Sequence, residues 1–406
     1  MSTRPRIVVT GIGVVTSVGI GVEPFWRNLL AGQSGIGRVE SFDTGRYAVH
    51  LGGEVKSFVP ADFVKTLRLD SIARASQLAI AAARLALADA GLPAAVTDAS
   101  TVGVSIGTTS GEPEMIERFD DMELAGSREH IGGEFIGQYP CHVIAAHLAS
   151  ELGFRGPNLV IPTACAAGNY AISHALDTLR FEGADIMLAG GSDAFSRIPS
   201  PGFARLGAIA PERVQPFDKN RKGMIPGEGA AVLVLEPLDR ATARRARIYA
   251  EVAGYGLTCD AHHMTAPQGD GAARAMQMAM ADAAITPAEV GYISAHGTGT
   301  AVNDRVETAA VKQAFGEVAY RVPMSSIKSM LGHTMGAASA IEAAACALAV
   351  RDGRLPPTIN LETSDPECDL DYVPNEARSQ AVDVAMNNAY AFGGNNASVI
   401  FRKCHA

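Results

Sequence analysis

Apolar runs of strand length alternate with longer segments whose apolar residues recur at helical spacing. Glycine, proline or polar residues bound each run, as expected where one element ends and the next begins. In the first part of the chain the pattern predicts strands at 7–15, 102–106, 158–161, 184–189 and 230–235, and helices at 78–90, 141–151 and 166–181.

The second part of the chain repeats this scheme. It predicts strands at 247–254, 290–295, 322–325, 382–388 and 397–401, and helices at 271–284, 304–315 and 337–351. Alternating strands and helices are typical of α/β proteins with parallel, helix-covered sheets. We expect an internal duplication into residues 1–250 and 251–406, with the active site between the halves, and surface loops at 196–222.

Length and charge exclude several classes of function. The 406 residues suffice for one large or two fused domains, and the net charge of −9 argues against general affinity for nucleic acid or anionic membranes. No apolar run approaches the roughly 20 residues that cross a bilayer, and the N-terminus leads directly into a strand. The sequence therefore predicts a cytoplasmic protein without membrane segments.

The cysteines are scattered without the spacing of a zinc site or a CxxC motif. This distribution predicts free thiols in a reducing compartment, and neither a metal nor an organic cofactor is expected. The positions are Cys141, Cys165, Cys259, Cys346, Cys368 and Cys404.

Cys165 stands where the predicted strand 158–161 passes through Pro162 into the predicted helix 166–181. A cysteine at a helix N-terminus faces unpaired N–H groups and the positive end of the helix dipole, which favours thiolate over thiol. The position therefore predicts a nucleophile. Taken alone, it would equally fit a small buried apolar residue.

Two histidines follow later in glycine-rich turns, at similar strand ends. His296 precedes Gly297-Thr298-Gly299, and His333 follows Gly332. Either one alone would fit a core histidine beside a tight turn. With Cys165, they supply one nucleophile and two imidazoles able to hydrogen-bond a thioester oxygen, which are the parts for carbon–carbon chemistry at an acyl thioester.

With these motifs the chain resembles the beta-ketoacyl-acyl-carrier-protein synthases, particularly the type II elongating enzymes of bacterial fatty acid synthesis, and the related ketosynthases of polyketide synthesis. The likeness runs from 8–16 through 260–265 and 356–360 to 392–394. It implies an α/β protein with the five-layered αβαβα thiolase-like fold, built from two duplicated halves.

The resemblance also implies roles for the motif residues. Cys165 would carry the acyl group, with its own N–H and that of Phe392 as the oxyanion hole and the Phe392 ring as a gate. His296 and His333 would polarise the malonyl thioester carbonyl, where charge develops after decarboxylation. Substrate-binding positions implied in the same way are Ser110, Phe203, Thr298, Thr300, Gly393 and Gly394.

Supporting residues are expected next to the histidines. By the family pattern Lys328 supports His333, and Glu307 would pair with Lys328, since a buried ammonium without a partner would be costly. Asp304 belongs either to this network or to an ordinary ion pair on a helix surface. Ser110 stands where an isoleucine often shapes the acyl pocket, which implies an altered chain length or a less saturated acyl group.

The resemblance predicts a ketosynthase that condenses acyl and malonyl units held as thioesters on an acyl carrier protein. Fatty-acid-type elongation is favoured. The alternative is the ketosynthase subunit of a type II polyketide or polyene pathway, working with a chain-length-factor-like partner. A thiolase fits the 328–333 motif less well, and a nonenzymatic chain length factor would lack Cys165. A homodimer or a heterodimer is expected, with carrier docking by Lys65, Arg68, Arg74 and Arg205.

Overall fold

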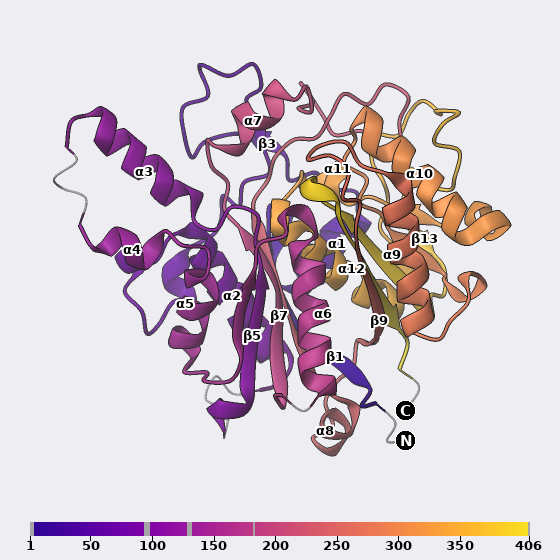
Figure 1. Cartoon of the computed structure of the whole chain (residues 1–406), viewed down its shortest axis with the longest axis horizontal. Coiled ribbons are helices and arrows are strands. Elements are labelled where there is room, and N and C mark those ends of the chain that lie inside the picture. Colours follow the sequence, from indigo (N-terminus) through magenta and orange to yellow (C-terminus); the bar gives the residue numbers. More distant parts are fainter. Residues whose placement is uncertain (1–3, 93–97, 128–131, 182, 405–406) are drawn as a thin grey trace.

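The computed structural model describes residues 4–92, 98–127, 132–181 and 183–404. Among the described residues the main sheet has eleven strands: ten follow one another in a single order, five from each part of the chain, and the short strand β2 (Gly19–Ile20) pairs with β1 (Ile7–Thr16). Figure 1 shows the sheet and its helices. The first five strands are β1, β5 (Val102–Gly107), β6 (Asn158–Ile161), β7 (Ile186–Asp193) and β8 (Gly229–Pro237). The second five are β9 (Ala250–Cys259), β10 (Tyr292–Ser294), β11 (Met324–Ser325), β14 (Val384–Tyr390) and β15 (Asn395–Arg402).

The two sets of strands have the same order and the same directions. The spatial order is β11-β10-β14-β15-β9-β1-β8-β7-β5-β6, so the sets meet at β1 and β9, which share only two residue pairs. In the first set β1–β8 and β8–β7 are antiparallel, whereas β7–β5 and β5–β6 are parallel. In the second set β9–β15 and β15–β14 are antiparallel, whereas β14–β10 and β10–β11 are parallel.

The expectation of parallel sheets therefore holds for only two of the four strand pairings in each set. Strands β14 and β15 are joined by the short loop 391–394, which permits only an antiparallel pair because a parallel pair needs a long crossover. Strands β7 and β8 are joined by a longer segment that holds only the short helix α7 (Pro199–Arg205). That helix also corrects the expectation that 196–222 forms loops alone.

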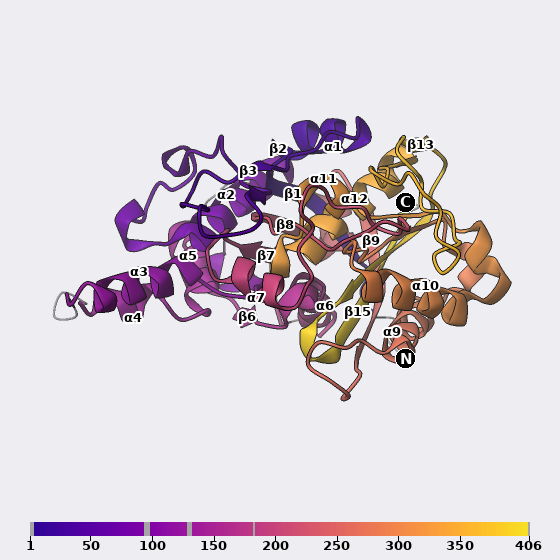
Figure 2. The ribbon, with the colours of Figure 1, turned by 90° about the horizontal axis from the view of Figure 1, so that it is seen from above.

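The two sets of strands are two layers of the fold, and helices form the other three. The outer helices α2 (Arg74–Asp89) and α5 (Val143–Leu152) lie against the first set of strands, and α9 (Gly269–Asp282) and α10 (Ala301–Phe315) against the second. Between the sets, α6 (Ala167–Arg180) and α12 (Ala338–Asp352) pack on each other and on strands of both sets. This arrangement confirms the predicted αβαβα fold, with its two parts side by side in Figure 2.

The two central helices approach closely because small residues face each other. Every residue of α12 from Ala338 to Val350 is buried, and most are alanine. A Cβ placed on Gly168 of α6 would lie 2.5 Å from the backbone nitrogen of Ala340, so only glycine fits there. The N-terminal ends of both helices are thereby brought to one place in the interior.

Smaller elements complete the chain. The remaining helices are α1 (Val22–Leu30), α3 (Pro113–Leu124), α4 (Glu134–Gln138), α8 (Leu238–Ala243) and α11 (Lys328–Leu331). The sequence pattern did not reveal α1 and α3. The remaining strands are β3 (Gly37–Arg38), β4 (Leu51–Gly52), β12 (Arg354–Leu355) and β13 (Arg378–Ser379). Among the described residues, no helix has the length and apolar character to cross a membrane.

Candidate active site

A strained turn presents Cys165 at the start of α6. Ala164 has φ 48°, in the left-handed region, and the short 3-10 turn Ala164–Ala166 then leads into the helix. A non-glycine residue held in that region costs about 1–3 kcal/mol, and such strain persists only where the surroundings enforce it. The turn places Cys165 at the helix N-terminus, as predicted, with 9% of its surface exposed.

The same turn recurs at the start of α12. Met335 has φ 52° and opens the 3-10 turn Met335–Ala337, which leads into that helix. His333 lies just before this turn. His296 follows β10 and precedes Gly297, which has φ 38°. Both histidines are thus carried by sharp turns, as their glycine neighbours indicated.

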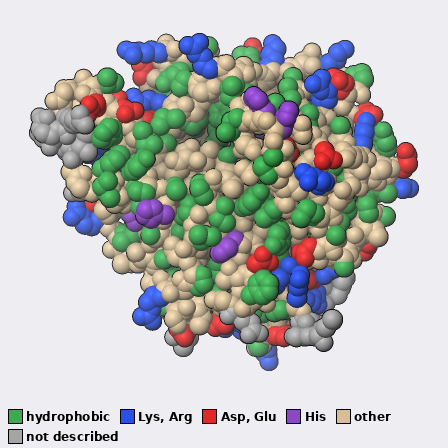
Figure 3. All heavy atoms as spheres, in the orientation of Figure 1, with side chains coloured by type: hydrophobic (Ala, Val, Ile, Leu, Met, Phe, Trp, Pro, Cys, Tyr) green, Lys and Arg blue, Asp and Glu red, His purple; other side chains and the backbone are tan. Residues whose placement is uncertain are grey.

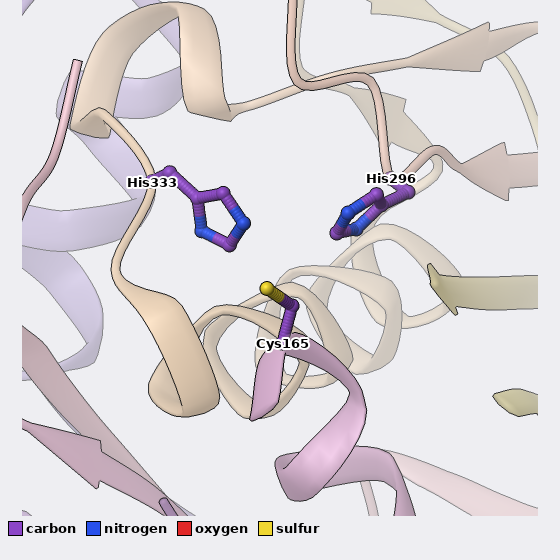
Figure 4. Close-up of side chains that lie close together, drawn as sticks. All are labelled: Cys165, His296 and His333. Atoms are coloured by element: carbon purple, nitrogen blue, oxygen red, sulfur yellow. The ribbon is translucent and has the colours of Figure 1, made fainter. Parts of the chain in front are cut away.

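The structure brings Cys165, His296 and His333 into one buried cluster. The cysteine sulfur and a ring nitrogen of each histidine lie within 4.8 Å of one another. The two imidazole rings are 5.5 Å apart at an angle of 81° and point toward the sulfur from opposite sides (Figure 4). The sequence had singled out these three residues, although they are separated by up to 168 positions.

Hydrogen bonds fix the tautomer of both histidines. The Met335 N–H donates to Nδ1 of His333 at 3.1 Å, so Nε2 of that ring carries the proton. Nδ1 of His296 lies 3.5 Å from the Lys328 ammonium, which can only donate. Each ring therefore offers an Nε2–H donor to the cluster.

Both imidazoles are neutral at physiological pH. Burial, and then the positive charge of Lys328, hold the pKa of His296 and of His333 well below the ordinary value of 6.5. Neutral imidazoles can donate a hydrogen bond to an oxygen without adding a second positive charge beside Lys328.

The buried partner of Lys328 corrects one expectation. Lys328 is 1% exposed and forms an ion pair with Glu342 of α12 rather than with Glu307. Its contact with a histidine is to His296 rather than to His333. The Glu307 carboxylate instead accepts hydrogen bonds from the backbone N–H groups of His296 and Gly297, each at 2.8 Å.

Two buried carboxylates therefore hold the His296 turn. Beside Glu307, Asp304 accepts the N–H groups of Phe217 at 2.7 Å and Gly299 at 3.1 Å. Asp304 is fully buried, so the structure assigns it to the site network and not to a helix surface. Both acids lie in the first half of α10.

The environment of Cys165 differs from the expectation of a resting thiolate. Burial raises the pKa of its thiol to about 12, although the nearby Lys328 lowers it. A helix end alone does not offset this desolvation. The resting site therefore holds a thiol, which must lose its proton as it attacks.

A cavity of about 270 Å³ opens onto the cluster. Of the predicted substrate-binding residues, it is lined by Phe203, Thr298, Thr300 and Gly394, and by the gate residue Phe392. The rings of Phe203 and Phe392 lie 5.7 Å apart, and Phe392 is 39% exposed. These two aromatic rings therefore stand at the mouth.

Two predicted substrate residues lie elsewhere. Ser110 and Gly393 are outside the residues that line this cavity. The N–H of Ser110 donates to Asp193 at 3.1 Å, because the loop after β5 turns toward that carboxylate. The N–H of Gly393 donates to the carbonyl of Met264 at 2.8 Å, so Gly393 ties the gate loop to a neighbouring loop.

Sequence reasoning missed three residues of the site. Glu342 is the one acid among the small and apolar residues of 338–350, and that isolation was a usable signal. Asp193 ends a buried strand directly after Gly190-Gly191-Ser192. Tyr390 stands two positions before Phe392 and lines the cavity.

The cluster also has the donor set of a metal site, one thiol and two imidazoles. A metal would need the lone pair of Nε2 on each histidine. On His333 the Met335 N–H occupies Nδ1 and leaves the proton on Nε2. The hydrogen bonding therefore suits donation to a substrate oxygen and not ligation of a cation.

The residues expected to dock a carrier protein are not equivalent. Lys65, Arg68 and Arg205 are exposed. Arg74 instead reaches inward and pairs with the buried Glu228 at 2.8 Å. Arg74 is thus half-buried with its charge already paired, which favours the other three residues as docking residues.

Comparison with known proteins places this cavity in context. The sequence matches the family descriptions "Beta-ketoacyl synthase, N-terminal domain" over residues 4–241 and "Beta-ketoacyl synthase, C-terminal domain" over residues 249–362. It is 40% identical to a protein named 3-oxoacyl-[acyl-carrier-protein] synthase 2 from Synechocystis sp., covering 98% of both chains. A protein of the same name from Staphylococcus aureus is also 40% identical, with both chains fully covered.

Solved structures give the same picture. One titled "The ishigamide ketosynthase/chain length factor" has a TM-score of 0.97 and 44% identity, covering 99% of this chain and 100% of that one. A ketosynthase from a complex with a type II polyketide acyl carrier protein has a TM-score of 0.91 and 35% identity, with coverage of 99% and 100%.

The buried hydroxyl of Tyr390 gives a test of how the site affects the stability of the fold. The ring of Tyr390 packs edge-on against His296 at 5.7 Å, and its buried hydroxyl has no hydrogen-bond partner in the described part of the chain. Leaving a buried donor unpaired costs about 1–3 kcal/mol. We expect Tyr390→Phe to raise the free energy of unfolding by about 1 kcal/mol in urea denaturation.

Tyr292→Phe is the matched control. The buried Tyr292 hydroxyl bonds to Ser325 at 2.8 Å, so its removal should lower the free energy of unfolding by about 1 kcal/mol. If Tyr390→Phe destabilised the protein as Tyr292→Phe does, the Tyr390 hydroxyl would have a partner after all.

Proposed function

The chain belongs to the beta-ketoacyl synthase family, and on that premise we propose how its own residues carry out the condensation. It is an acyltransferase that joins an acyl group to a malonyl unit, both held as thioesters, with loss of CO₂. The observation that carries the assignment of roles is the buried cluster of one thiol and two neutral imidazole donors at the end of a cavity.

In the first half-reaction, the Cys165 sulfur attacks the acyl thioester carbonyl. The bond from that carbonyl to the carrier sulfur breaks, and the departing carrier thiol takes up the proton that Cys165 gives up. We assign the oxyanion hole to the backbone N–H groups of Cys165 and Phe392. Donors aimed at the developing oxyanion commonly supply several kcal/mol of transition-state stabilisation.

In the second half-reaction, the malonyl thioester occupies the cavity. The bond to its carboxylate breaks, CO₂ leaves, and the electron pair forms an enolate. His296 and His333 donate through Nε2 to the thioester oxygen, where negative charge grows, so they stabilise the transition state more than the ground state. The enolate carbon attacks the acyl carbonyl, and Cys165 leaves as a thiolate that regains a proton.

The remaining residues of the site serve these steps indirectly. Lys328 holds His296 in its donor tautomer, and Glu307 holds the His296 turn. Thr298 and Thr300, whose hydroxyls lie 2.9 Å apart at the cavity wall, would bind the polar arm that carries the thioester. Phe203 and Phe392 would admit or exclude the acyl chain at the mouth.

Fatty-acid-type chain elongation is the favoured pathway, because relatives named for that synthase match the chain over its full length. A second candidate is a polyketide or polyene pathway with a partner subunit. It is favoured by the 44% identity and TM-score of 0.97 with a ketosynthase/chain length factor.

Either pathway fits a dimer, with itself or with a related subunit. Strand β6 is at the edge of the sheet and, among the described residues, pairs with β5 alone. Its Leu159 is 40% exposed, and large apolar side chains are exposed nearby in chain order on α3, α4 and the end of α6, namely Leu124, Ile136, Tyr139 and Phe181. Figure 3 shows one face of the molecule, on which many of the charged side chains lie toward the border and apolar side chains are spread over the centre.

Two further assignments follow from the same premise. We propose that the chain consists of two half-domains, residues 1–250 and 251–406, because their strands share one order and one set of directions. We also propose a cytoplasmic location, which the six free cysteines support.

The division of labour between cysteine and histidines has a direct test. Cys165→Ala should form no acyl-enzyme when incubated with acyl thioesters, measured by intact-protein mass spectrometry. His296→Ala and His333→Ala should still load the acyl group while CO₂ release from the malonyl thioester falls about 100 to 1000-fold, the usual loss for one such donor. Equal loss of loading and decarboxylation would remove the division.

The choice between pathways depends on whether the chain works alone. We expect the purified chain to sediment as a homodimer and to condense acyl and malonyl carrier thioesters without another subunit. Activity that appears only after adding a related subunit without the nucleophilic cysteine would establish the second candidate instead. The mass of the acyl group trapped on Cys165 then reports the chain length.

A further inference from the structure

Asp193 is the last residue of β7 and is 1% exposed. Its carboxylate receives four hydrogen bonds. Oδ1 accepts from the Thr108 hydroxyl at 2.8 Å and from the Ser110 N–H at 3.1 Å. Oδ2 accepts from the N–H groups of Thr109 at 2.7 Å and Gly336 at 2.6 Å. One carboxylate thus joins the loop after β5 to the 3-10 turn Met335–Ala337, which leads into α12.

The bond to Gly336 bears directly on His333. Gly336 follows Met335, whose left-handed backbone and N–H fix the His333 ring. The contact is too tight for any other residue, since a Cβ on Gly336 would lie 2.5 Å from the Thr109 nitrogen and 2.7 Å from Asp193 Oδ2. The Asp193 carboxylate therefore holds the strained turn Met335–Ala337 in place through its contact with Gly336.

We propose that Asp193 is a positioning residue for decarboxylation, which holds the Met335 turn so that His333 keeps its Nε2–H aimed at the substrate oxygen. This inference rests on the proposed function of His333 as a donor to the malonyl thioester. No mechanistic step involves Asp193 touching the substrate.

The charge of Asp193 has a cost that argues for such a role. All its hydrogen-bond donors are neutral, and among the described residues no cation pairs with it. A buried anion without a counter-ion is expensive. Its negative charge also raises the pKa of the Cys165 thiol, which opposes loading. A neutral amide side chain could not bind the loop and the turn in the same way, because it has one acceptor oxygen whereas the four donors are bound by two.

Asp193→Asn therefore slows decarboxylation without slowing loading. The amide keeps one acceptor oxygen and turns its NH₂ toward backbone donors, so the turn at Met335 shifts. We expect kcat for malonyl decarboxylation to fall about 100-fold, as for a catalytic group displaced by about 1 Å, with KM unchanged. Loading of Cys165 should be as fast as in the wild type or faster, because a negative charge is gone.

The experiment measures both half-reactions at pH 8, where the carboxyl of Asp193, whose pKa burial raises to about 6, is ionised. Loading is followed by quenched intact-protein mass spectrometry, and decarboxylation by CO₂ release from a malonyl thioester. Gly336→Ala is the second variant. It keeps the carboxylate but displaces the same contact, so decarboxylation should fall while loading stays at the wild-type rate.

Asp218→Asn is the matched control. Asp218 is also fully buried and accepts backbone N–H groups from Asn220, Glu362 and Thr363, none of which lines the cavity. The Asp218→Asn variant should leave the ratio of decarboxylation to loading unchanged. If Asp193→Asn does not fold, by circular dichroism, the Gly336→Ala result decides.

Two outcomes would overturn the inference. One is an equal loss of loading and decarboxylation in the folded Asp193 or Gly336 variant, which would indicate general damage. The other is wild-type decarboxylation in either variant. His333→Ala is measured alongside, because full decarboxylation in that variant would refute the proposed donor role itself rather than the role of Asp193.

Discussion

The ion pair between Lys328 and Glu342 is the interaction on which the chemistry of the site depends. Both side chains are buried between the two sets of strands, where neither charge could stand alone. The ammonium faces Nδ1 of His296, and its charge lowers the pKa of His296, His333 and Cys165 together. Burial and the charge of Lys328 thus act together to keep the two imidazoles neutral, and the same charge lowers the pKa of the Cys165 thiol.

The packing of α6 and α12 between the two similar sets of strands creates the place where this pair is stable. Each central helix begins with a strained turn, at Ala164 with φ 48° and at Met335 with φ 52°. One turn presents the Cys165 sulfur, and the other fixes the His333 ring. Because small residues let α6 and α12 approach closely, both turns end in the same interior volume. Neither set of strands with its helices contains the site by itself, because Cys165 comes from the first set and His296 and His333 come from the second.

The sequence predicted most elements and the three central residues, since strand-end turns and glycines are local signals. It did not predict the partner of Lys328, because Glu342 lies 14 positions further along the chain, in the buried helix α12. Ser110 was misplaced because a loop's direction depends on a distant acceptor, here Asp193. Strand direction in β8 and β15 was also missed, because periodicity reports burial and not pairing.

The most direct measurement is a nitrogen-15 NMR titration of histidine-labelled protein, with His296→Ala and His333→Ala used to assign the two signals. We expect both rings to remain neutral, with the proton on Nε2, from pH 8 down through the ordinary histidine pKa of 6.5. A ring that gains a proton near pH 6.5, or that carries its neutral proton on Nδ1, would contradict this expectation.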